Sequence, residues 1–215
     1  MDKRRYVQRA RAAAAEERRS RILAAAKGSL ERGLVGALKV EDVAREAGVS
    51  RSTVYLLFGS RAGLFEALAY QLRDEAGFER LVEANRLPDA LEAFRSALRV
   101  AVGLYARQPN LTRGLFTLAV IDPDAVRAVA ALEDGRRPGM VDLAKRLRRQ
   151  GYLRAGVSIA EAADMLTVVT SFQAFDQLFG GSGLPADTVA DRLIALGERA
   201  VCRPSSSIPA DPPDA

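Results

Sequence analysis

Residues 40–58 read VEDVAREAGVSRSTVYLLF and decide the fold, because they predict two short helices joined by a tight turn. Val40 and Val43 recur at helical spacing and give the first helix one apolar face. Gly48 tolerates the left-handed backbone that closes such a helix. Ser50 can cap the next helix through its side-chain oxygen. The stretch is therefore a predicted helix-turn-helix, an arrangement with which proteins enter a DNA groove.

The second of these helices directs its polar side chains outward, while Val54 and Phe58 face the interior. Arg51 begins this helix, where a long side chain can reach guanine O6 and N7. Arg61 begins the helix that follows, where backbone amides and the positive end of the dipole attract phosphate. The predicted DNA-binding residues are Lys39, Ser50, Arg51, Ser52, Thr53, Tyr55 and Arg61.

The stretch resembles the TetR family of bacterial regulators. Residues 40–50 are similar to that family's second helix and turn, and residues 51–57 to its recognition helix. Residues 58–65, FGSRAGLF, resemble the entry to its fourth helix. The resemblance implies dimerisation through the last two long helices and a ligand cavity in the C-terminal helices, with the bound ligand altering the spacing of two DNA-binding heads.

Four positions depart from the family pattern. Lys39 replaces a helix-capping Thr, and Arg61 replaces a Lys while keeping its charge. Leu56 and Leu57 stand where the family usually has polar or aromatic residues that contact phosphate. The two leucines therefore take the place of contacts that the resemblance would otherwise carry over.

Positive charge gathers on the segment that contains the motif. Residues 1–61 hold 14 Lys and Arg against 7 Asp and Glu, whereas the remaining 154 residues hold 18 against 20. A basic segment that coincides with a helix-turn-helix is typical of phosphate binding. The alternative, a basic surface that only aids solubility, leaves that coincidence unexplained.

Composition removes most enzyme chemistry. The chain has no His, which excludes Ser-His and Cys-His pairs, His-based proton shuttles and ordinary His-ligated zinc. Cys202 is the one cysteine, so no intrachain disulfide is possible, and we expect it to be a small apolar residue near a helix end. No apolar run suits a signal peptide or a membrane span. We expect a cytoplasmic protein with no cofactor and no metal.

The apolar residues keep helical spacing almost throughout, so the predicted fold is all-α. The resemblance implies a three-helix DNA-binding head followed by a helical ligand-binding and dimerisation domain. The start of the chain is either a solvated tail or an arm that reaches the minor groove. The predicted domains are a basic arm at 1–17, a DNA-binding domain at 18–63, a ligand-binding and dimerisation domain at 64–202 and a disordered tail at 203–215.

The last two predicted helices, 159–180 and 186–201, are apolar on two sides. One side of each can pack on its own domain, and the second side suits a copy of itself in a two-fold interface. Burial inside a monomer is the alternative. The resemblance favours a homodimer through these helices.

A regulator of this kind needs a cavity, and the resemblance points to the middle of the C-terminal helices. The candidate lining is aromatic and aliphatic with few polar groups, which suits a largely apolar small molecule. Its residues are Phe94, Leu98, Val102, Tyr105, Leu115, Phe116, Met140, Leu143, Phe172, Phe175 and Asp176. Each of them also suits an ordinary core position.

The sequence is therefore interpreted as a ligand-responsive, homodimeric repressor that a small molecule releases from a palindromic operator. Two alternatives stay open. One is a DNA-binding regulator without an inducer, in which side chains fill the pocket. The other is an α-helical enzyme with an appended basic head, against which the missing histidines argue.

Overall fold

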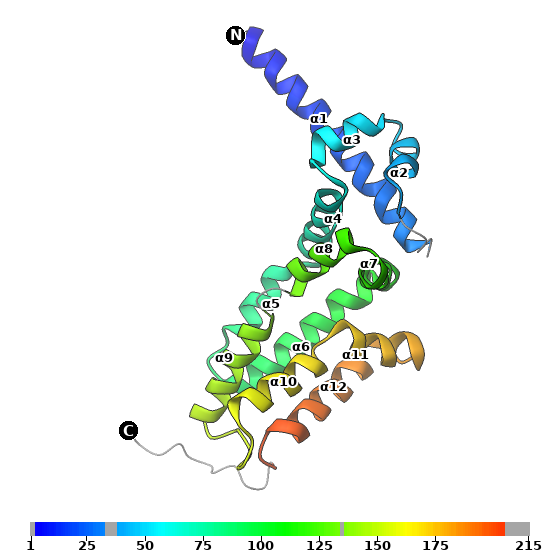
Figure 1. Ribbon diagram of the computed structural model, residues 1–215. Coiled ribbons are helices and arrows are strands. Elements are labelled where there is room, and N and C mark those ends of the chain that lie inside the picture. The colour runs from blue at the N-terminus through cyan, green and yellow to red at the C-terminus, as the bar shows by residue number, and fades with distance from the viewer. Residues whose placement is uncertain (1–2, 33–37, 134–135, 205–215) are drawn as a thin grey trace. The chain divides into compact units, whose positions relative to one another are not determined.

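A computed structural model describes residues 3–32, 38–133 and 136–204 of the chain. All regular segments of this described part are helical, which confirms the all-α prediction (Figure 1). One isolated antiparallel bridge joins Leu153 to Cys202. No helix in the described part of the chain is long and apolar enough to cross a membrane.

The chain folds into two compact units that interleave in sequence. Residues 1–73 and 110–132 form the N-terminal unit, and residues 74–109 and 133–215 form the C-terminal unit. This differs from the predicted division at residues 63 and 64 in two respects, because the first boundary lies between residues 73 and 74 and the segment 110–132 groups with the head.

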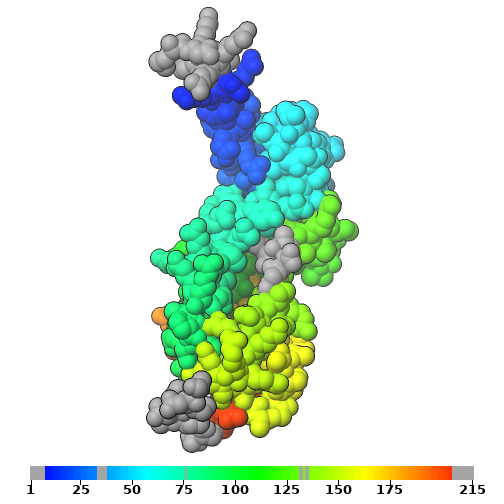
Figure 2. Space-filling model, turned by 90° about the vertical axis from the view of Figure 1, so that its left-hand side faces the viewer, coloured from blue at the N-terminus to red at the C-terminus, as the bar shows by residue number. Residues whose placement is uncertain are grey.

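The N-terminal unit contains α1 to α4, α7 and α8. Both α2 and α3 pack against α1, and Figure 2 shows the cyan surface of α3 beside the blue surface of α1. The helix bounds are α1 Lys3–Glu31, α2 Val40–Glu46, α3 Arg51–Phe58, α4 Arg61–Ala76, α7 Pro109–Ile121 and α8 Pro123–Glu133.

The C-terminal unit contains the remaining helices. In it, α6 packs against α5, α9 and α12, and α10 packs against α9 and α12. The helix bounds are α5 Phe78–Asn85, α6 Ala90–Arg107, α9 Arg136–Arg149, α10 Ile159–Val169, α11 Phe172–Asp176, the π-helix η1 Gln177–Gly181 and α12 Ala186–Val201.

Local signals set the ends of the helix-turn-helix as the sequence predicted. Gly48 has a φ of 64°, so the chain leaves α2 through the left-handed conformation that glycine tolerates. The Ser50 side chain accepts a hydrogen bond from the Thr53 amide at 3.2 Å and caps α3. Ser60 does the same for the Gly63 amide at 3.0 Å, at the start of α4. Lys39 precedes α2 without making a side-chain cap.

One core holds the N-terminal unit together. Ile22 and Leu30 of α1, Val54 of α3 and Phe65 of α4 are each at most 2% exposed. Leu115 of α7 belongs to the same cluster and is fully buried. The short helix α3 is therefore held from behind by residues distant in the sequence.

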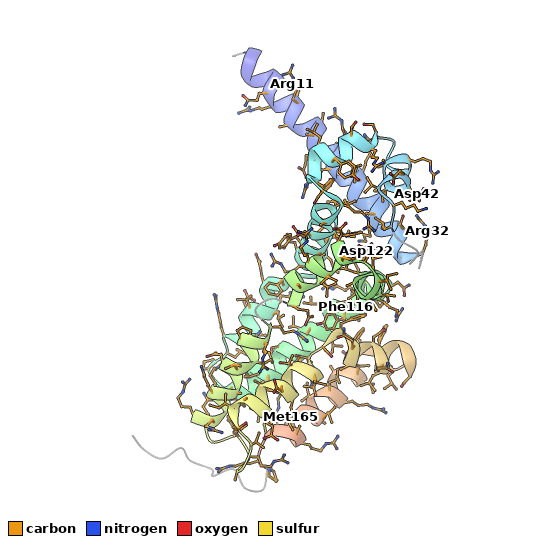
Figure 3. The ribbon with its side chains drawn as sticks, viewed as in Figure 1. Arg11, Arg32, Asp42, Phe116, Asp122 and Met165 are labelled. Atoms are coloured by element: carbon orange, nitrogen blue, oxygen red, sulfur yellow. The ribbon has the colours of Figure 1, made fainter. Side chains whose placement is uncertain are left out.

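The first helix is longer than the sequence suggested. Instead of beginning after a basic arm, α1 runs from Lys3, so residues 3–17 are part of it and not a disordered tail. Residues 8–13 are exposed, and Arg11 is labelled among them in Figure 3. The predicted disordered tail lies outside the described residues from 205 onward.

The predicted single helix at 159–180 is wrong, because the structure breaks it between α10 and α11. The Thr170 hydroxyl donates to the Leu166 carbonyl at 2.8 Å and the Ser171 hydroxyl donates to the Val168 carbonyl at 2.7 Å. Ser171 also accepts from the Ala174 amide at 3.1 Å and so caps α11. Such side-chain bonds compete with a continuous helix. A similar break at Gly77, with a φ of 79°, separates α4 from α5.

The final helix, α12, buries one side against α6. A Cβ atom added at Gly197 would lie 2.5 Å from Cζ of Phe94, so only glycine allows this approach. Ile194, on the same side, is 7% exposed. Cys202 is buried directly after α12, as the sequence predicted for a small apolar residue at a helix end.

Candidate nucleic-acid interface

The outer face of α3 carries the polar residues that the sequence assigned to it. Arg51 and Ser52 are exposed, Thr53 and Tyr55 are half-buried, and Val54 is buried behind them. Lys39 and Ser50 are also exposed, at the starts of α2 and α3. Six of the seven predicted DNA-binding residues therefore lie around these two helices with side chains at least partly accessible.

Ser50, Ser52 and Thr53 form one hydroxyl cluster at the start of α3. The Ser50 hydroxyl lies 2.8 Å from the Ser52 hydroxyl and 2.8 Å from that of Thr53. Because each hydroxyl can both donate and accept, the cluster can turn a donor toward a phosphate oxygen without losing the Ser50 cap.

Arg51 is oriented by two neighbours. Its guanidinium lies 2.7 Å from Glu41 Oε1, donates to the Tyr55 hydroxyl at 3.3 Å and lies 5.4 Å from the centre of the Tyr55 ring. The Tyr55 hydrogen bond and the Glu41 charge raise the pKa of Arg51. Glu41 was not predicted from the sequence as its partner, although this pairing joins α2 to the start of α3.

Arg61 has a different environment from the other six residues. Its guanidinium makes a two-pronged ion pair with Asp122, with one contact at 2.9 Å, and reaches Asp124 at 3.3 Å and the Leu38 carbonyl at 3.0 Å. It also lies 4.9 Å from the centre of the Phe65 ring. Asp122, labelled in Figure 3, lies between α7 and α8. Arg61 thus links α4 to α8 within the N-terminal unit, and its phosphate contact stays a prediction.

Asp122 is a partner that no local pattern could reveal, since it lies 61 residues from Arg61. Its side chain is only 10% exposed, and that of Arg61 is 23% exposed. The Arg61 hydrogen bond lowers the pKa of the Asp122 carboxyl. The pair is therefore a largely desolvated element of the head.

The C-terminal unit brings three of the five predicted aromatic residues together, Tyr105, Phe172 and Phe175. The Tyr105 ring centre lies 5.4 Å from that of Phe172 and 5.5 Å from that of Phe175. Phe179, which was not among the predicted lining residues, stacks on Phe175 at 4.8 Å. The Tyr105 hydroxyl donates to the Thr170 carbonyl at 3.4 Å, and burial raises the pKa of Tyr105 to about 12.

The other predicted lining residues divide between the two units. Those in the C-terminal unit, apart from half-buried Asp176, are buried side chains of α6 and α9, namely Phe94, Leu98, Val102, Met140 and Leu143. Leu115 and Phe116 belong instead to α7 of the N-terminal unit. Leu115 is part of that unit's core, and Phe116, labelled in Figure 3, is half-buried.

A capped helix-turn-helix on a basic three-helix head defines the class of helix-turn-helix DNA-binding proteins. Residues 22–68 match the model of a family described as bacterial regulatory proteins, tetR family. Residues 22–68 therefore form a helix-turn-helix domain of the TetR type, as the resemblance predicted. This family comprises regulators and not enzymes, in agreement with the sequence interpretation.

Two regulators share part of the sequence. The chain is 30% identical over 100 residues to the HTH-type transcriptional regulator EthR of Mycolicibacterium smegmatis, covering 46% of each chain. It is 36% identical over 95 residues to the HTH-type transcriptional regulator AlkX of Mycobacterium tuberculosis, covering 43% of this chain and 44% of AlkX. The match thus spans less than half the length of either relative.

A solved structure extends the likeness to most of the fold. NalD, the secondary repressor of the MexAB-OprM multidrug efflux pump in Pseudomonas aeruginosa, aligns with a TM-score of 0.67 and 25% identity. The alignment covers 88% of this chain and 98% of NalD. The C-terminal helices therefore share an architecture with a known repressor.

The Arg61–Asp122 pair should stabilise the head. Asp122→Asn leaves the guanidinium without its main charged partner, so we expect about 2–4 kcal/mol of lost unfolding free energy at pH 7. Because the folded-state pKa of Asp122 is lowered, the pair stabilises fully above the unfolded pKa of about 3.9 and weakens as pH falls through the folded pKa. The difference between wild type and Asp122→Asn should therefore shrink below about pH 4.

Denaturant unfolding at several pH values measures this difference. Asp124→Asn is the matched control, since Asp124 is 40% exposed and lies farther from the guanidinium. It should cost less than about 1 kcal/mol. Equal losses for the two variants would show that the pair with Asp122 has no special role.

Proposed function

We propose that the chain is a homodimeric transcriptional repressor that reads a palindromic operator with α3 and releases it when an apolar small molecule binds the C-terminal unit. The observation that carries the DNA-binding part is the exposed Arg51 and Ser52 at the capped start of α3, on the head that holds the net positive charge. Long donor side chains at the start of a recognition helix reach base edges in the major groove.

The contacts that Arg51 makes in the absence of DNA favour a role in base reading over simple charge attraction to phosphate. Its contacts with Glu41 and Tyr55 hold the guanidinium in one orientation before DNA arrives. A guanidinium held in place loses less conformational freedom when it binds guanine through two hydrogen bonds. The nearby carboxylate of Glu41 also disfavours random phosphate contact at this position, because like charges repel.

Exposed apolar residues support dimerisation through the last helices. Val168 of α10 is 64% exposed and Leu196 of α12 is 48% exposed, and these two helices pack against each other. The opposite side of α12, with Ile194 and Gly197, is already used against α6. A second copy of the chain would remove Val168 and Leu196 from water.

Three observations support a repressor with an apolar effector. NalD, which shares the fold, is a repressor of a multidrug efflux pump. In this chain the Tyr105, Phe172 and Phe175 rings form an aromatic cluster in the C-terminal unit. The Tyr105 hydroxyl donates a long hydrogen bond of 3.4 Å to the Thr170 carbonyl, so it can turn to a ligand acceptor at small cost.

Replacement of Arg51 tests the DNA-reading proposal. In vitro selection with the full chain supplies an operator, and competition against a scrambled duplex measures specificity. Arg51→Ala should lose about tenfold to a hundredfold in the affinity ratio, because one bidentate base contact disappears. Arg45→Ala removes the same charge from an exposed α2 residue that pairs with Asp42, and it should leave the ratio unchanged. The same ratio for wild type and Arg51→Ala would exclude base reading by Arg51.

A charge at Leu196 tests the dimer. Leu196→Glu would bury a carboxylate at the subunit interface and should weaken association by about 3–5 kcal/mol while the protomer stays helical. Val126→Glu is the matched control, because Val126 is 49% exposed but lies on α8 of the N-terminal unit. Sedimentation at micromolar concentration should show a monomer for the first variant and a dimer for the second. Two folded dimers would move the interface elsewhere.

Thermal unfolding in the presence of small apolar compounds tests the effector. A compound that binds the folded protein at a hundred times its Kd should stabilise it by about 2.7 kcal/mol. Tyr105→Phe should keep its own stability within about 1 kcal/mol but bind that compound less tightly, because the polar group of the cluster is gone. A screen in which aromatic and aliphatic compounds leave the melting temperature unchanged would favour the regulator without an inducer.

A further inference from the structure

Leu56 is the most exposed of the large hydrophobic residues that the structure describes, at 84%. It lies in the middle of α3, whose inner side is formed by the buried Val54. Single exposed leucines are ordinary on protein surfaces. What distinguishes Leu56 is its place, one helical turn after Ser52 and therefore on the face that presents Ser52 to solvent.

The outer face of α3 carries two parallel rows of residues. Arg51 and Tyr55 form one row and are in contact, as their 3.3 Å hydrogen bond shows. Ser52 and Leu56 form the other, since residues four apart lie above one another on a helix. The first row is occupied by polar groups at both positions. The second changes from a hydroxyl to a purely apolar side chain.

The chemistry of the major groove limits what Leu56 can contact. Base edges there present hydrogen-bond donors and acceptors, which a leucine cannot engage, and a single apolar group, the 5-methyl of thymine. Phosphate oxygens would lose water beside Leu56 without gaining a partner. Four residues of helix rise about 6 Å, so Leu56 reaches a base about two steps from the one that Ser52 meets.

We propose that Leu56 is a specificity-determining residue that contacts the 5-methyl group of one thymine in each operator half-site. This inference depends on the proposed function, because it requires that α3 enters the major groove. It gives the position that departs from the family pattern a role of its own, in which an apolar base contact replaces a phosphate contact.

Deoxyuridine replacement tests the contact, because it removes only the 5-methyl group. The probe is the duplex that the full chain selects from random DNA, with each thymine replaced singly. One position in each half-site should weaken wild-type binding about fourfold, the equivalent of one buried CH₂ group. Leu56→Ala should bind the unmodified duplex no more tightly than wild type binds the deoxyuridine duplex. That same replacement should cost Leu56→Ala nothing further.

A matched variant controls for the loss of an exposed hydrophobic residue. Val120 is 83% exposed on α7, and Val120→Ala should keep the wild-type deoxyuridine pattern. The inference is overturned if wild type tolerates every replacement, or if Leu56→Ala remains sensitive at the same position. Equal weakening of Leu56→Ala on selected and scrambled duplexes would also overturn it. If the full chain selects no sequence from random DNA, the proposed function itself is wrong. That result is distinct from the failure of the Leu56 contact alone.

Discussion

The structure of the DNA-binding surface depends on one constraint, which is that α3 has only eight residues and cannot form a stable helix alone. Its first turn is fixed by the Ser50 cap, and its direction is fixed by the left-handed turn at Gly48. Its inner side is fixed by Val54, which packs in a core shared by α1, α4 and α7. The outer side chains are therefore presented by a backbone whose position is determined by the whole head.

Charge has two separate roles in this head. The side chain of Arg51 is 59% exposed, and in the proposed function its guanidinium exchanges Glu41 for a base. Arg61 is desolvated and engages four groups, two of them carboxylates of the segment around the start of α8. The first arginine is suited to recognition and the second to holding helices together, although both are arginines at the starts of successive helices. Their partners, and not their positions in the motif, make the difference.

Sequence patterns predicted the features whose causes are local. Caps and turns such as those at Ser50 and Gly48 depend on residues within one helical turn, so they could be predicted from residues 40–58 alone. The role of Asp122 depends on a contact across 61 residues, and the placement of Leu115 in the head depends on packing. Periodicity also overlooked the break at Thr170 and Ser171, because hydroxyl bonds to the backbone leave the apolar spacing unchanged. Which predicted lining residues contact an effector is set by a ligand and stays a prediction.

Methylation interference on the selected operator tests most directly whether α3 reads DNA from the major groove. Guanine N7 lies in the major groove, so its methylation should block binding at positions in two half-sites about one helical turn, 34–36 Å, or a multiple of it apart. Interference confined to the minor-groove N3 of adenine, or interference without two-fold symmetry, would contradict a dimer that reads its operator through Arg51 and its neighbours on α3.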